Sequence, residues 1–315
     1  GTSSGPIIIT ETSTLTTKFD LDPLNTMTFE PPSADTLVVN YSGYDVTFAS
    51  TDTTQMDLKA RATTEMTNVV VRNFVPAAVA IAGTASLTFG NSARIELGGD
   101  QTTTFPLVFN GTTSLDGGGY TLTISETNGI SVKASSTLTL KNMTIAGMSG
   151  EALAGLASSS TVVCENVTFL LTDNATFSTG ALQMNKSNSI TGGKRFIYTS
   201  PTALTINGYA TLTIGTDTTY VYDPSDDSPN VLQFADSTAQ LIFVNSTFEI
   251  ANTGALLTKG TMVINDAATF SSLATNLAGA LVLGDGANSS NDVTVKVGAR
   301  GSLIVDGGVL HVRDA

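Results

Sequence analysis

Apolar and polar residues alternate along this chain in short runs, and most runs end in an asparagine or a glycine. A period of two predicts a β-strand with one buried side, so each run reads as a strand, a tight turn and a second strand. The clearest runs are residues 136–145 (STLTLKNMTI), 160–169 (STVVCENVTF) and 239–250 (AQLIFVNSTFEI). Looser copies lie at residues 85–97, 260–270 and 301–312.

The runs recur about every 20 to 28 residues, a period typical of stacked repeat architectures. When neighbouring runs are aligned, the apolar position Leu138 matches Val162, and Leu241 matches Met262. Each of these intervals suits one coil of a β-solenoid. We therefore expect an all-β shaft whose apolar core is a continuous column inside the coils.

Three asparagines, Asn142, Asn166 and Asn245, occupy the same point in the three clearest runs. Asparagine tolerates the left-handed backbone conformation that a tight bend needs, and its amide can bond to the same asparagine one coil away. The sequence therefore predicts a ladder of turn asparagines.

Residues 115–124 (LDGGGYTLTI) place three glycines between an aspartate and an alternating strand, which predicts a sharp corner. This segment resembles the opening coils of right-handed parallel β-helix proteins of the pectate-lyase-like and autotransporter-passenger type. As a pattern, the resemblance covers residues 80 to 315. It implies a right-handed parallel β-helix, and it marks architecture, not activity.

The N-terminal part, residues 1–80, differs from the rest in having more prolines and less regular runs. We expect residues 1–80 to form an irregular β cap or assembly module, and residues 81–315 to form the parallel β-helix shaft. An insertion loop is expected near residues 216–231. Residues 148–157 and 271–283 are the best helical candidates, but they are short or interrupted by glycine, so little helix is expected.

The net charge of −13 and the pI near 4.3 argue against a nucleic-acid partner, because phosphate binding depends on clustered lysine and arginine. No apolar run approaches the roughly 20 residues that a bilayer-spanning helix needs. The single cysteine, Cys164, lies in a predicted strand and reads as a small buried apolar residue.

Low charge, one cysteine and many threonine, serine and asparagine residues are the composition expected of an extracellular or cell-surface protein. The chain begins with Gly1, which suggests a processed chain or a piece of a longer one. Eight Asn-X-Ser/Thr triplets would be glycosylation acceptors on a suitable secretory route. Chance explains most of them in a chain of this composition.

The main alternative function is a carbohydrate-binding or carbohydrate-cleaving β-helix protein, such as a polysaccharide lyase or a glycosidase. Glycoside cleavage needs paired carboxylates, and lyase chemistry needs a base beside the substrate acid. The strands carry no aspartate pairs, and the only histidine, His311, lies far from any acidic cluster. No catalytic residues are therefore predicted, and no cofactor is expected beyond possible Ca²⁺.

Residues 217–230 (DTTYVYDPSDDSPN) are the densest acidic segment. Crowded carboxylates repel one another unless a cation screens them, so a weak Ca²⁺ site is a hypothesis there, although a solvated loop is the simpler interpretation. Tyr220 and Tyr222 flank these carboxylates and are the predicted ligand-contact residues. The predicted calcium ligands are Asp217, Asp223, Asp226 and Asp227.

Lys194 and Arg195 form the only adjacent basic pair and read as a charged turn. As a hypothesis, they contact an acidic sugar or the acidic loop of a neighbouring subunit. The aromatic residues Phe89, Phe169, Phe248 and Phe270 recur at repeat positions and read as a stacked core.

A solenoid exposes unpaired backbone at both ends, which a cap or another copy of the protein must cover. We expect the N-terminal strand to pair with a neighbouring subunit or seal the first coil, and the C-terminal strand to dock the next subunit. The predicted function is a non-enzymatic structural or adhesive subunit of an extracellular filament or surface layer. The assembly residues are Pro6, Ile7, Ile8, Ile9, Leu303, Val305, Leu310 and Val312.

Overall fold

The computed structural model describes residues 6–32, 36–225, 231–251, 254–272, 281–283, 293–298, 302–306 and 310–312. For residue 272 and for residues 302–306 and 310–312 it describes the backbone alone. All statements below concern these residues.

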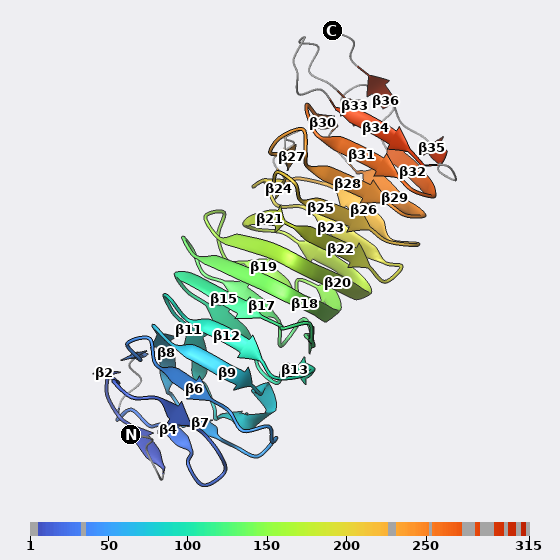
Figure 1. The fold of residues 1–315 in the computed structure, drawn as a ribbon. Helices are drawn as coiled ribbons and strands as arrows, with labels where there is room; N and C mark the ends of the chain where they lie inside the picture. Colours follow the sequence, from blue (N-terminus) through green and yellow to red (C-terminus); the bar gives the residue numbers. More distant parts are fainter. Residues whose placement is uncertain are drawn as a thin grey trace.

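The protein is a parallel β-solenoid of about 11 turns (Figure 1). Strands make up 56% of the chain and helix 1%. The one helix in the described part of the chain is the 3₁₀ turn η1 (Pro76–Ala78). All strand pairs given by the register are parallel, and Leu138 lies beside Val162 and Leu241 beside Met262, as the repeat spacing predicts. The handedness of the coil stays a prediction.

Two sheets belong to the N-terminal half alone. The first is β1 (Ile7–Ile9), β4 (Met27–Phe29), β7 (Met56–Leu58) and β10 (Val79–Ile81). The second is β2 (Ser13–Thr14), β5 (Thr36–Asn40), β8 (Thr63–Thr67), β11 (Ser86–Phe89), β14 (Leu107–Phe109), β17 (Ile130–Val132) and β19 (Leu153–Gly155).

One face, which we call the long face, runs through the whole rod. It comprises β3 (Phe19–Asp20), β6 (Asp45–Thr47), β9 (Val70–Phe74), β12 (Arg94–Leu97), β15 (Thr112–Asp116), the first parts of β18 (Thr137–Gly150) and β20 (Thr161–Phe177), β21 (Ala181–Asn185), β24 (Leu204–Ile206) and β27 (Leu232–Phe234). A three-stranded sheet of β30 (Ala255–Leu257), β33 (Leu281–Leu283) and β36 (Leu310–Val312) follows it.

Two further faces are built in the middle and C-terminal coils. One contains β13 (Gln101–Thr102), β16 (Thr121–Thr123), the middle of β18 and of β20, β22 (Ser187–Thr191), β25 (Thr211–Ile214), β28 (Gln240–Phe243), β31 (Thr261–Ile264) and β34 (Thr294–Val297). The other begins at the end of β20 and continues through β23 (Arg195–Tyr198), β26 (Thr219–Tyr222), β29 (Ser246–Ile250), β32 (Ala267–Ser272) and β35 (Ser302–Asp306).

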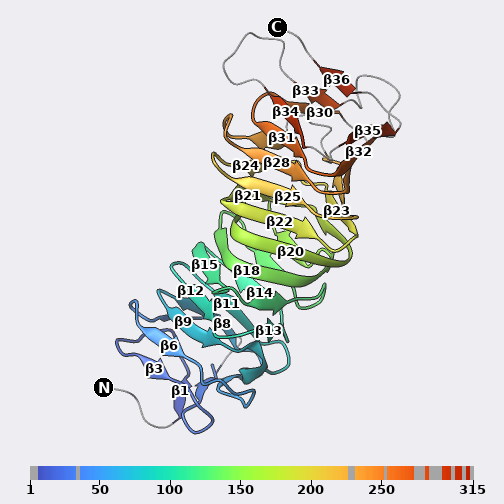
Figure 2. The ribbon, with the colours of Figure 1, turned by 45° about the vertical axis from the view of Figure 1, so that its right-hand side comes forward.

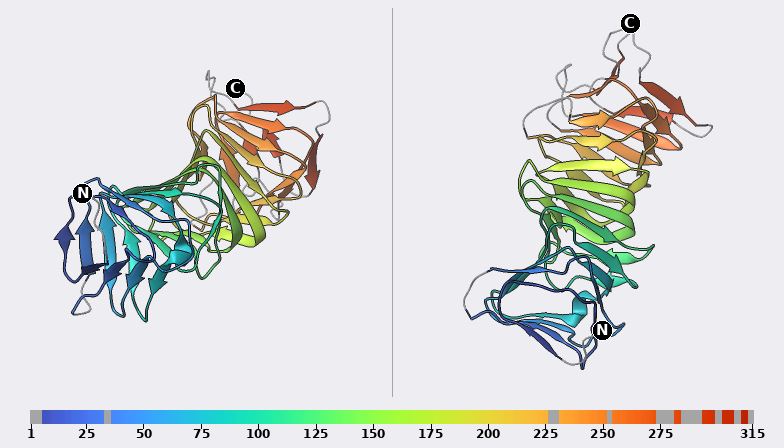
Figure 3. Two further views of the ribbon diagram at one scale, coloured as in Figure 1. Left: turned by 60° about the horizontal axis from the view of Figure 1, so that its bottom comes forward. Right: turned by 60° about the vertical axis from the view of Figure 1, so that its left-hand side comes forward.

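The cross-section therefore changes at the long strands β18 and β20. The sheet that ends at β19 is lost there, and the face that begins at the end of β20 replaces it. The rod is not straight: Figures 2 and 3 show the coils of the N-terminal half set at an angle to those of the C-terminal half. The first and last coils lie at opposite ends.

That residues 1–80 act as a cap or assembly module stays a prediction, but the strands of their described part are not irregular. β1 to β10 already form parallel coils, and β8 and β9 pair directly with β11 and β12 of the following coil. These strands are short, and Met27 pairs with Ile7 of the coil before it and with Met56 of the coil after it. Uneven coil length hides the repeat in this part of the sequence.

The predicted asparagine ladder is confirmed at the corner between the long face and its neighbour. Asn142, Asn166 and Asn245 all have positive φ, between 46° and 59°. Asn166 Nδ2 donates to Asn142 Oδ1 at 3.0 Å, and Asn142 Nδ2 donates to Asp116 Oδ1 at 3.3 Å. Each side chain thus ties one coil to the next.

The glycine triplet also forms the expected corner, directly after β15. Gly118 and Gly119 have positive φ, and a Cβ at Gly117 would lie 2.3 Å from Met143 Cβ of the next coil. Only glycine fits where two coils approach this closely.

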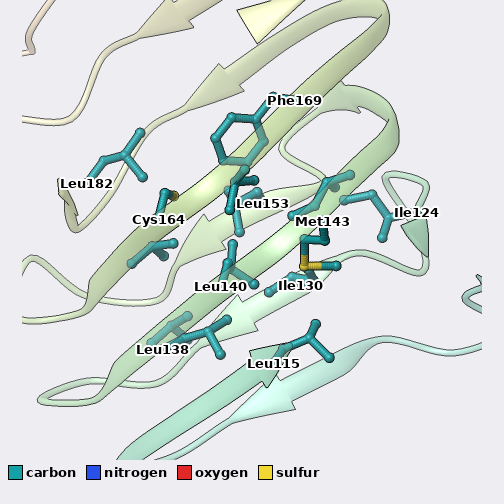
Figure 4. Close-up of a cluster of buried hydrophobic side chains, with 14 of the residues drawn as sticks. Leu115, Ile124, Ile130, Leu138, Leu140, Met143, Leu153, Cys164, Phe169 and Leu182 are labelled. Atoms are coloured by element: carbon teal, nitrogen blue, oxygen red, sulfur yellow. The ribbon is translucent and has the colours of Figure 1, made fainter. Parts of the chain in front are cut away.

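The core is a continuous apolar column, part of which Figure 4 shows around Leu140 and Cys164. Cys164 is fully buried, as predicted, and burial raises the pKa of its thiol. Aromatic rings pack against one another from coil to coil in two columns, in stacked, tilted or edge-on pairs. One column is Phe48, Phe74, Phe89 and Phe109, and the other is Phe169, Phe196, Tyr220, Phe248 and Phe270.

Candidate functional site

The predicted insertion loop near residues 216–231 contains a strand, because residues 219–222 form β26 in register with β23 and β29. Asp217 and Asp223 stand at opposite ends of this strand. A strand rises about 3.3 Å per residue, so they lie on the order of 20 Å apart and cannot ligate the same ion. The remaining calcium candidates, Asp226 and Asp227, lie outside the described residues.

Asp217 belongs to a corner of the solenoid. It has a φ of 57°, and its Oδ1 accepts a hydrogen bond from Asn245 Nδ2 at 3.3 Å. Asp217 thus resembles the turn asparagines: it is a short polar residue in a left-handed backbone conformation at a corner between two strands. Among the described residues, no group of three or more histidine, cysteine, aspartate or glutamate side chains could hold a metal ion.

The predicted ligand contact at Tyr220 and Tyr222 is wrong, because both rings are in the core. Tyr220 is 1% exposed and Tyr222 0%. Tyr220 lies in register with Phe196 and Phe248, and its ring centroid is 6.2 Å from that of Phe196. Both tyrosines of β26 therefore point into the core.

The three buried tyrosines of this region differ in what their hydroxyl groups bind. Tyr198 Oη donates to Thr202 O at 2.6 Å, and Tyr222 Oη accepts from Val231 N at 3.1 Å. Tyr220 Oη has no hydrogen-bond partner among the described residues.

Tyr220→Phe is therefore expected to preserve or raise stability, by up to about 1 kcal/mol, because it removes a buried unpaired hydroxyl. Tyr198→Phe is the matched control. It is expected to lower the free energy of unfolding by about 1 kcal/mol, because the carbonyl oxygen of Thr202 loses the hydrogen bond from the tyrosine hydroxyl. Denaturant unfolding of both variants checks the pair. A loss of stability in Tyr220→Phe equal to that in Tyr198→Phe would contradict this assignment.

High pH is expected to destabilise the fold through these tyrosines. Burial raises the pKa of Tyr41, Tyr198 and Tyr220 above the usual value near 10. The contribution of these tyrosines to the free energy of unfolding is fully present below pH ~10, the usual pKa of tyrosine in an unfolded chain. It is lost as the pH rises toward their pKa values in the folded protein, because the tyrosines of the unfolded chain ionise first. Phenolate absorbance and circular dichroism, recorded together, should show these tyrosines ionising only as the strands unfold.

Arg195 is committed to an intramolecular ion pair. Its Nη1 and Nη2 both bind the carboxylate of Glu249, and the Nη1 to Oε2 distance is 2.9 Å. These hydrogen bonds raise the pKa of the guanidinium further. The pair spans two coils and crosses β26, where Val221 faces outward yet is only 2% exposed. The prediction that Arg195 contacts a partner is therefore replaced by a structural role, while that for the exposed Lys194 stays a prediction.

A second charged row lies on the long face of the N-terminal half. Arg72 Nε binds Asp45 Oδ2 at 2.7 Å, and Arg72 Nη1 binds Glu96 Oε2 at 2.6 Å. Glu96 also pairs with Arg94 at 2.9 Å. These residues join three successive coils, and sequence reasoning missed them because the two partners of Arg72 lie one coil before it and one coil after it.

A groove on the long face is lined by polar, apolar and cationic side chains. It has a volume of about 660 Å³ and is lined by residues in or next to β24, β27 and β30. These three strands are labelled in the upper half of Figure 1. Thr205, Gln233 and Leu256 alternate with buried neighbours in these strands and therefore face outward into it. Lys259 lies at the corner after β30. The remaining lining residues are Leu232, Phe234, Ala235, Leu257 and Thr258.

Lys259 forms no ion pair with a described carboxylate, whereas seven ion pairs occur elsewhere in the described chain. The nearby Asp236 is held in its own turn, because its Oδ1 accepts from Thr238 N at 2.8 Å. Hydrogen bonds from the Thr238 side chain and backbone, with a smaller contribution from Lys259, lower the pKa of Asp236. The groove thus presents a cation that the fold leaves without a bound carboxylate.

The predicted assembly residues lie in the end coils. β1 pairs with β4 alone among the described strands, and Ile8 of β1 is 62% exposed. Pro6 is exposed, while Ile9 is buried and Ile7 packs against the core. Leu303 and Val305 lie in β35, and Leu310 and Val312 lie in β36, where the backbone alone is described.

The last described coil exposes residues that are in core register. Val295 pairs with Met262, and Val297 pairs with Ile264. The two partners are buried, but Val295 is 37% exposed and Val297 53%. Sequence reasoning did not single out these valines, although their alternation in residues 294–297 is a visible signal.

No protein-family model, curated protein or solved structure matches this chain. The class that the structure defines is therefore the fold alone: a parallel β-solenoid. None of the described helices is long and apolar enough to cross a membrane.

Proposed function

We propose that this chain is a non-enzymatic structural element of an extracellular or cell-surface assembly, a rod that is extended end to end by β-strand pairing. The observation that carries the proposal is at β34, where Val295 and Val297 stand in core register and no described strand pairs with the outer edge. The parallel arrangement supports it, because another coil can add to either end in the same direction.

The ladders between coils support a mechanical role. Asparagine side chains join the coils at one corner, Arg195 and Glu249 span three strands, and aromatic rings stack along the core. Each coil therefore transmits load to its neighbours through packing and hydrogen bonds as well as through the chain.

Mass photometry at two concentrations tests the proposal. The native chain is expected to form oligomers that increase with concentration. Replacing Val295 and Val297 by lysine is expected to leave monomers, because charges on the end surface oppose the stacking of a further coil. Ile242→Lys is the matched control, since Ile242 faces outward in β28, where its strand partners Thr213 and Val263 carry no charge. Monomers of the native chain at both concentrations would overturn the proposal.

A further inference from the structure

We propose that the groove over β24, β27 and β30 is a binding site for an extended acidic peptide segment, with a carboxylate of that segment on Lys259. The site goes beyond the structural role proposed above and does not depend on it. It combines a volume of about 660 Å³ with a lining of polar, apolar and cationic side chains. That volume lies in the range typical of small-ligand sites.

The charge of the groove selects an anion. The protein as a whole carries a net charge of −13, which disfavours anionic partners over most of its surface. Lys259 lines the groove without an ion-pair partner among the described carboxylates. Asp236, the neighbouring acid, already accepts hydrogen bonds from Thr238. A ligand carboxylate would therefore meet a cation that the fold does not occupy.

The rest of the lining favours a peptide over a sugar. Sugar rings bind well on exposed aromatic faces, and the one aromatic residue in the lining, Phe234, is 3% exposed and belongs to the core. Thr205 presents a hydroxyl that can donate a hydrogen bond to a peptide C=O group and accept one from a peptide N–H group. Leu256 offers an apolar contact for one side chain. Together these groups suit a short segment lying across three coils.

Fluorescence anisotropy with labelled hexapeptides tests the site. The probe is a peptide of alternating threonine and leucine that carries one glutamate, and the comparison peptide has glutamine at that position. The glutamate peptide is expected to bind more tightly. Lys259→Gln is expected to weaken it roughly tenfold, because a charge-assisted hydrogen bond is lost, and to leave the glutamine peptide unchanged.

Lys141→Gln is the matched control, since it removes the same charge from the long face at β18, away from the groove. It is expected to leave both affinities unchanged, and Leu256→Ser is expected to weaken both peptides. Equal affinity for the two peptides in the native protein, or equal losses in Lys259→Gln and Lys141→Gln, would overturn the proposal. Binding of an oligogalacturonate without binding of either peptide would overturn it as well, in favour of a sugar.

Discussion

Phe196→Ala is expected to lower the free energy of unfolding by about 3–5 kcal/mol, the range for removing a buried aromatic ring. Phe196 is 1% exposed and lies between Phe169 and Tyr220, with ring centroids 6.5 and 6.2 Å away. Its removal leaves a cavity between coils and breaks the aromatic column in the middle. Denaturant unfolding measures the loss.

The control for this variant is Ile197→Ala, in the same strand but on the outer side. Ile197 is only partly buried, so its truncation is expected to cost about 1 kcal/mol or less. Hydrogen exchange adds a spatial readout: Phe196→Ala should lose protection in the flanking strands β20 and β26 as well as in β23. Similar losses for the two variants would show that the column does not carry the stability assigned to it.

Asn188→Ala is expected to cost about 2–4 kcal/mol, because one buried amide satisfies three backbone groups. Asn188 is 3% exposed in β22. Its Oδ1 accepts from Val167 N at 3.0 Å, and its Nδ2 donates to Asn185 O at 2.7 Å and to Cys164 O at 3.3 Å. The alanine variant leaves these groups buried with fewer partners. Thermal and denaturant unfolding give the magnitude.

Asn166→Gly is the comparison for Asn188→Ala. Asn166 likewise bonds to a neighbouring coil, but it lies at a corner between two faces, its side chain is exposed, and its φ is 59°, a conformation that glycine adopts without strain. Water replaces its lost hydrogen bonds, so the expected cost is below about 1 kcal/mol. A larger loss at Asn166 than at Asn188 would contradict the view that burial sets the value of these amides.

Much of the fold could be predicted from the sequence because each coil of a solenoid repeats the same local pattern, in which apolar and polar residues alternate and a turn residue follows. Alternation identified the strands, and the match between Leu138 and Val162 that the repeat interval predicts is the register of the structure. The turn asparagines were predictable because a left-handed corner restricts the residue type. The N-terminal coils were not recognised, because very short strands give too little alternation to read.

The candidate site was much less predictable. Tyr220 and Tyr222 were assigned to the acidic segment that follows them. Aligning this strand with the strand one repeat earlier would have matched them with Phe196 and Tyr198, and so would have placed them in the core. Arg195 and Glu249 are far apart in the sequence, and no local pattern encodes a contact over two coils. The groove is likewise formed by side chains from three coils. Its depth depends on how these coils stack in the folded chain.

Negative-stain electron microscopy of the native protein tests the central claim most directly. We expect rods that lengthen in steps of one chain along the solenoid axis, and we expect them to disappear when Val295 and Val297 are replaced by lysine. Compact particles of one chain at every concentration, or dimers joined side by side, would contradict end-to-end assembly.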